Sequence, residues 1–220
     1  MRIRVTFTKQ GALRYTGHLD LHKIWERATR RANLPLAYSQ GFHPQPKIQL
    51  AAALPLGFSS RCELVDIWVS NEEDLAALPG RLSKAIPPGL GILSVAQVDE
   101  KSPPLQTQVA SADYEISLPA EIDQGQLTQS LSAVMDAETL PRERRGKPYD
   151  LRPLIETLTP IPSPFQGEGR RGEGGPALFM RLSAREGATG RPEEVLAALG
   201  IPFPSEGTRI ERSRSIFKGE

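Results

Sequence analysis

Hydrophobic and polar residues alternate over residues 2–7, RIRVTF, so Ile3, Val5 and Phe7 share one face of a predicted strand. Over residues 18–32 the apolar residues instead recur at helical spacing, and basic side chains fill most of the other side. The pattern further predicts strands over 48–54, 63–69 and 90–98, and a helix over 71–86 with Asn71 at its N-cap. The first half thus has the order β-α-β-β-α-β, the split βαβ pattern.

The same order returns after residues 99–108, whose composition is that of a linker. The predicted strands of the second half are 114–118, 149–158, 178–182 and 209–217, and its helices are 124–135 and 192–199. We therefore predict an α+β fold of two tandem ferredoxin-like halves, residues 1–100 and 108–220.

One segment does not fit this plan. Residues 159–175, TPIPSPFQGEGRRGEGG, are rich in Pro, Gly and Ser and separate two predicted strands that a short turn could join. Such a segment buries too little apolar surface to offset the entropy of ordering it. We expect a disordered insertion in a hairpin, with no role in a functional site.

Composition sets limits on compartment and chemistry. The formal net charge is +1, and the single cysteine, Cys62, excludes an intramolecular disulfide or an all-cysteine cluster. No signal-like or membrane-spanning apolar run occurs, so we expect a cytoplasmic protein that does not enter a membrane. The sequence has no nucleophile elbow, phosphate-binding loop or dinucleotide motif.

Three histidines lie in the first 43 residues. His18 and His22 are four residues apart and would share a helix face, so they could ligate a metal with His43 as a distant third ligand. The alternative is that His18 and Asp20 occupy the first helical turn, where a carboxylate favours the positive end of the helix dipole. No general-base motif or carboxylate cluster accompanies the histidines, so we expect no metal and no cofactor.

A second basic group lies at residues 142–147, RERRGK, followed by Arg152. Its cations, with Gly146 allowing close backbone approach, suit the phosphate oxygens of an anion or nucleic acid. The alternative is an exposed hairpin tip without a ligand.

The connector at residues 37–48, AYSQGFHPQPKI, carries more chemistry than a turn needs. If the connector lies beside the basic side of the first helix, the rings of the connector could stack on a base while the arginines of that helix contact phosphate. The alternative is that Tyr38 and Phe42 fill the core and the prolines stiffen a crossover. The predicted ligand-binding residues are His18, Asp20, Arg27, Arg30, Arg31, Tyr38, Ser39, Gln40, Gly41, Phe42, His43, Lys47, Arg144, Arg145, Lys147 and Arg152.

Several of these motifs together resemble a known family. Residues 17–20 (GHLD), 38–44 (YSQGFHP), 54–57 (LPLG) and Glu63 are similar to the radical SAM-linked protein family, with weaker matches at 150–154 and 191–196. Members of this uncharacterised bacterial family are fused to, or look like partners of, B12-binding-type radical SAM proteins. The chain has Gly17 where the family often has Ser, and both residues cap helices. The resemblance implies a radical SAM partner and no defined activity.

The expected function is a non-catalytic accessory module of a radical SAM system, which binds RNA or a nucleotide-containing substrate through a basic and aromatic groove. Two alternatives stay open. The connector could dock the radical SAM protein directly, or the histidines could serve an RNA-processing or metal-assisted enzyme.

Overall fold

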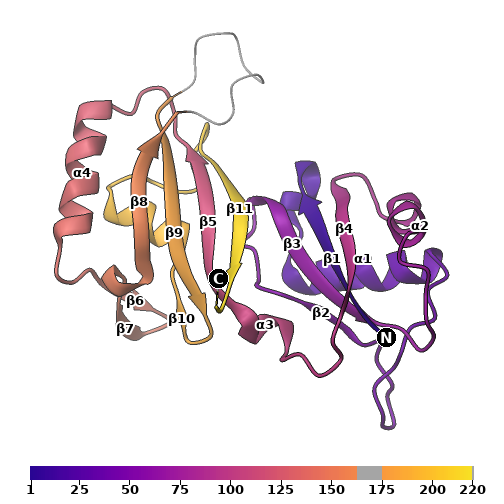
Figure 1. Cartoon of the computed structure of the whole chain (residues 1–220). Helices are drawn as coiled ribbons and strands as arrows, with labels where there is room; N and C mark the ends of the chain where they lie inside the picture. Colours follow the sequence, from indigo (N-terminus) through magenta and orange to yellow (C-terminus); the bar gives the residue numbers. More distant parts are fainter. Residues whose placement is uncertain (163–174, 220) are drawn as a thin grey trace. The chain divides into compact units, whose positions relative to one another are not determined.

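The computed structural model describes residues 1–162 and 175–219. The chain divides into two compact units, Met1–Val109 (unit 1) and Ala110–Glu220 (unit 2). Each unit combines α-helices with a mostly antiparallel β-sheet (Figure 1). No helix in the described part of the chain is long and apolar enough to cross a membrane.

Unit 1 has a four-stranded sheet in the order β2-β3-β1-β4, in which each neighbouring pair is antiparallel. Its elements are β1 (Arg2–Lys9), a 3-10 helix η1 (Gly11–Tyr15), α1 (His18–Arg31), β2 (Ile48–Leu50), β3 (Ser59–Trp68), α2 (Leu78–Ala85), β4 (Leu90–Val98) and α3 (Leu105–Gln108).

The core of unit 1 lies between one face of this sheet and the helices α1 and α2. The alternating residues Ile3, Val5 and Phe7 of β1 are fully buried there. The Trp25 ring of α1 meets the Phe7 ring edge-on, with 4.8 Å between the ring centroids. The alternation predicted for residues 2–7 therefore places this face correctly.

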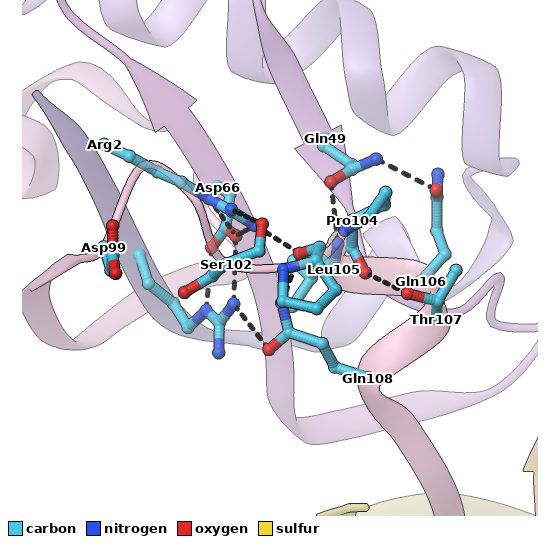
Figure 2. Close-up of polar contacts among 12 residues, drawn as sticks. Arg2, Gln49, Asp66, Asp99, Ser102, Pro104, Leu105, Gln106, Thr107 and Gln108 are labelled. Atoms are coloured by element: carbon cyan, nitrogen blue, oxygen red, sulfur yellow. Dashed lines mark hydrogen bonds and ion pairs between the residues drawn. The ribbon is translucent and has the colours of Figure 1, made fainter.

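The opposite face of β1 carries Arg2 and Arg4, which share one buried carboxylate (Figure 2). Asp66 on β3 is fully buried, and Arg2 donates to its Oδ2 from Nε at 2.9 Å and from Nη2 at 2.6 Å. Arg4 donates to Oδ1 at 2.8 Å and to Oδ2 at 3.0 Å. We call these three residues the Asp66 clamp.

The clamp also holds residues 99–108 against the sheet of unit 1. Arg2 donates to the carbonyl oxygens of Ser102 (2.7 Å) and Pro103 (3.1 Å), and Arg4 donates to Gln108 (3.2 Å). The segment with linker composition thus contains a short helix, α3, and makes specific hydrogen bonds to the sheet (Figure 2).

Unit 2 has its strands in the order β8-β9-β5-β11, with β10 also on β9 and β6-β7 forming a separate hairpin. Its elements are β5 (Val109–Ser117), α4 (Gln124–Asp136), β6 (Pro141–Arg144), β7 (Lys147–Asp150), a 3-10 helix η2 (Arg152–Leu154), β8 (Ile155–Ile161), β9 (Ala177–Arg185), β10 (Ala188–Thr189), α5 (Pro192–Ala198) and β11 (Arg209–Phe217).

As in unit 1, one face of the sheet of unit 2 is apolar and buried, and the other face carries an ion pair between neighbouring strands, here β5 and β9. Leu178, Met180 and Leu182 of β9 are fully buried, whereas Asp113 of β5 and Arg181 of β9 pair on the other face. Arg181 donates to the two oxygens of Asp113 at 2.7 and 2.9 Å.

The second helix is shorter than predicted, because it begins at Leu78 and not near Asn71. Pro79 lacks an N–H group and fits only the first turn of a helix, so a helix from Asn71 would place it in the interior. The Asp74 carboxylate instead accepts from the Ala76 N–H at 3.0 Å and forms a turn ahead of the helix.

The predicted strand over residues 149–158 is broken. β7 ends at Asp150, whose carboxylate accepts from the N–H groups of Leu140 (2.7 Å) and Arg152 (3.0 Å), and η2 separates it from β8. The disorder predicted for the insertion at residues 159–175 is also wrong for its first residues, because Thr159, Pro160 and Ile161 pair with β9. Residues 163–174 of the predicted insertion lie outside the described residues.

We predict that Asp66→Asn destabilises unit 1 by about 3–5 kcal/mol, because it leaves the buried guanidinium group of Arg2 and the partly buried one of Arg4 without their carboxylate. Both tryptophans, Trp25 and Trp68, lie in unit 1, so urea unfolding followed by tryptophan fluorescence reports on this unit. The exposed control Glu72→Gln should change the free energy of unfolding by less than about 0.5 kcal/mol. A loss below about 1 kcal/mol in Asp66→Asn would contradict the role of the clamp.

Candidate functional site

The connector between α1 and β2 forms a two-stranded finger, which we define as residues 37–47 (Figure 1). Within it Tyr38 and Pro46 form a β-bridge, and the Ser39 N–H donates to the Gln45 carbonyl at 2.8 Å. At its root, the Ala37 N–H donates to the Trp68 carbonyl at 2.8 Å, and the Trp68 N–H donates to the Lys47 carbonyl at 3.0 Å. The finger is therefore an ordered extension of unit 1.

The aromatic residues of the finger face solvent. Phe42 is 102% exposed and Tyr38 is 42% exposed. The alternative that these rings fill the core is wrong, because Leu36 and Ile48 on either side of the finger take the buried positions. Gly41 has φ 128°, a conformation that favours glycine, and it precedes Phe42 at the tip.

His43 and Gln40 are exposed beside Phe42, and Ser39 is only partly exposed. The Ser39 hydroxyl accepts from the Gln45 N–H at 3.0 Å, so this side chain stabilises the finger. Lys47 is exposed at the root. The finger therefore presents a phenyl ring, an imidazole and an amide together at its end.

The arginines on the basic side of α1 differ in whether they already bond to another residue. Arg31 donates to the Ala85 carbonyl at the end of α2, so it links the two helices. Arg27 and Arg30 are exposed, and within residues 1–162 and 175–219 neither makes a hydrogen bond or an ion pair. These two cations are the ones that α1 can offer to a ligand.

Arg81, which the sequence did not single out, and His22 connect α1 to its surroundings. Arg81 of α2 donates to the carbonyl oxygens of Ala32 (2.8 Å) and Asn33 (2.9 Å), directly after the end of α1. The Nε2 atom of His22 lies 3.2 Å from the Ile48 carbonyl oxygen, next to the root of the finger. Because a carbonyl only accepts, Nε2 carries the proton of this bond.

His18 lies in the first turn of α1 after Gly17, which caps the helix without a side-chain hydrogen bond. Burial lowers the pKa of His18, Lys9 and His22 lower it further, and Glu63 opposes them. Asp20 is exposed and pairs with Lys23 at 3.6 Å. In the described parts of the chain, no three His, Cys, Asp or Glu side chains lie close enough together to hold a metal ion.

Lys9 also belongs to this region, and it is only 1% exposed. Its Nζ donates to the Thr16 carbonyl at 2.8 Å. The sequence contained a signal for it, because Lys9 continues the buried positions 3, 5 and 7 of β1.

The basic residues of unit 2 also differ in role. Arg144, Arg145 and Lys147 are exposed on the β6-β7 hairpin, whose turn has φ 52° at Arg145 and 75° at Gly146. Arg152 instead donates to the Met135 carbonyl at 2.8 and 3.1 Å and to the Ile155 carbonyl at 3.1 Å. It therefore stabilises the end of α4.

Comparison with known families gives a match that covers most of the chain. Residues 2–192 match a family described as an uncharacterized protein conserved in bacteria, DUF2344. The chain belongs to the DUF2344 family. No protein of curated function matches this DUF2344 chain. The family description mentions no radical SAM protein, so a radical SAM partner stays a prediction.

We predict that acidification destabilises unit 1 of the DUF2344 protein through His18. Its lowered pKa means that the unfolded chain binds a proton more readily than the folded chain. Stability is therefore highest above the ordinary value of 6.5 and falls as the pH drops from there through the lowered pKa.

The check compares urea midpoints from tryptophan fluorescence at about pH 7.5 and pH 5.5. His18→Gln should show a smaller loss on acidification than the wild type, whereas His43→Gln, at an exposed position, should match the wild type. An unchanged loss in His18→Gln would show that another group causes the pH dependence.

Proposed function

We propose that the DUF2344 protein is a non-catalytic accessory module that binds RNA, or a nucleotide-containing substrate, through its finger and the basic side of α1. The observation that carries this proposal is the full exposure of Phe42 at the tip of an ordered hairpin. An aromatic ring held in solvent by paired backbone offers a base a stacking surface at a low cost in entropy.

Nearby polar groups support the same ligand. Arg27 and Arg30 occupy the last two turns of α1, and residues 32–36 then lead directly into the finger. Lys47 adds a cation at the root, where His22 of α1 lies beside Ile48. Cations of this kind neutralise backbone phosphates, while exposed rings stack on bases of any sequence.

The β6-β7 hairpin of unit 2 supplies a separate group of exposed cations, Arg144, Arg145 and Lys147. We propose that this hairpin contacts RNA phosphates without reading the base sequence.

The radical SAM partner is proposed from the resemblance in the GHLD and YSQGFHP motifs. The chain has one cysteine, so the partner would supply the iron–sulfur cluster. A second candidate function uses the same observation, because an exposed Phe42 could also insert into a pocket of the partner protein.

We further propose that both units are copies of one ferredoxin-like plan. The order β2-β3-β1-β4 in unit 1 corresponds to β8-β9-β5-β11 in unit 2, when strands are matched by their place along the chain. In this comparison α1 and α2 correspond to α4 and α5, and the β6-β7 hairpin is an addition.

The binding test titrates a fluorescent single-stranded RNA with wild-type protein, Arg30→Ala and Phe42→Ala at several salt concentrations. Arg30→Ala should reduce the slope of log affinity against log salt by about 0.7, the value for one phosphate contact on a single strand. Phe42→Ala should weaken binding by about 1–3 kcal/mol at every salt concentration, because stacking is not screened.

Two exposed positions provide matched controls. Lys84→Ala removes a cation from α2 and Leu56→Ala removes a side chain that is 60% exposed, so neither should alter binding. Absence of saturable RNA binding by the wild type would reject the RNA ligand. If a radical SAM protein then co-purifies with the wild type but not with Phe42→Ala, the docking function replaces it.

A further inference from the structure

Unit 2 contains an open pocket of about 650 Å³, a volume typical of small-ligand sites. Its lining comes from β5, β8, β9 and the C-terminal end of β11, and it includes Ser111, Glu156, Arg181, Arg185, Phe217 and Lys218. None of the residues predicted as a site from the sequence lines it.

The polar lining has an excess of positive charge. Arg181 is paired with Asp113, and this hydrogen-bonded carboxylate raises the pKa of its guanidinium group. Arg185 and Lys218 are both exposed, and their side chains make no hydrogen bond or ion pair with any other residue that the structure describes. Two cations at the pocket are therefore available to an anion.

The rest of the lining favours an organic anion over a bare ion. Ile216 and Phe217 contribute apolar surface at the end of β11. The Glu156 Oε1 atom accepts from the Ser111 hydroxyl at 2.5 Å, and its second oxygen makes no hydrogen bond within the described chain. That oxygen can accept from a ligand hydroxyl group.

We propose that this pocket is a second ligand site, which binds a phosphate monoester that carries a sugar and a flat ring, the chemistry of a nucleoside monophosphate. Arg185 and Lys218 bind the phosphate, Glu156 accepts from a sugar hydroxyl, and the Ile216–Phe217 surface contacts the ring. The site goes beyond the proposed RNA-binding function, because it shares no residue with the finger or with α1.

The test is calorimetric titration of the full chain with adenosine 5′-monophosphate, ribose 5-phosphate and inorganic phosphate. Wild-type protein should bind the nucleotide most tightly, because only the nucleotide uses all three parts of the lining. Arg185→Gln/Lys218→Gln should weaken nucleotide binding on the order of tenfold or more, since it removes two charge-assisted contacts. The matched double variant Lys84→Gln/Lys101→Gln removes the same charge from exposed positions of unit 1 and should leave binding unchanged.

Glu156→Gln gives a second, opposite signal. It removes a negative charge from the lining, so it should strengthen binding of inorganic phosphate while weakening that of the nucleotide. Backbone NMR shifts on adding nucleotide should map to residues 110–111, 181–185 and 216–219.

Absence of saturable binding by the wild type, an equal loss in the two double variants, or shifts confined to residues 37–47 would each overturn the second site. The last of these results would leave the finger as the binding surface, so failure of this site is distinguishable from failure of the RNA-binding proposal. Equal affinity for inorganic phosphate and nucleotide would overturn the assigned ring and sugar contacts.

Discussion

A single buried carboxylate shared by two arginines organises unit 1. Asp66 has no exposed surface, and a carboxylate in such a position requires close cationic partners. Arg2 and Arg4 both approach it, so the cluster carries one more positive charge than negative. The carbonyl oxygens of Ser102 and Pro103 accept from two further Arg2 N–H groups, and residues 99–108 are thereby fixed in place.

The same clamp supports the finger. Trp68 follows Asp66 by two positions on β3, and its ring lies under the Arg2 guanidinium group at 4.7 Å. The backbone of Trp68 bonds both strands at the root of the finger, through Ala37 and Lys47. An ordered root lets the finger hold Phe42 in solvent without a large ordering cost on binding. A substitution at Asp66 should therefore also disturb the finger that carries the proposed ligand surface. Asp66 has this effect although it lies on the opposite face of the sheet from the core.

Local sequence patterns predicted the helices and strands better than the tertiary contacts that their side chains make. The alternation of β1, the helical spacing of α1 and the bounds of β4 followed from the sequence, because each depends on residues close together in the chain. The Asp66 clamp did not, since its partners are 62 and 64 positions away. Composition also could not show whether Phe42 fills the core or meets solvent. A hairpin tip at residues 142–147 was only an alternative, and the single strand predicted over 149–158 did not separate β7 from β8.

The arginines predicted as ligand contacts fall into two groups, those that already donate to backbone carbonyl oxygens and those that do not. Arg31 and Arg152 looked like ligand contacts in the sequence, yet each donates to backbone carbonyls at a helix end. A guanidinium group that meets such acceptors would lose those bonds on turning to a phosphate, so its net contribution to affinity is small. Among the residues that the structure describes, Arg27 and Arg30 have no such bonds to lose. This difference, and not the number of cations in a motif, is the physical reason why the RNA contact is proposed for the exposed side of α1.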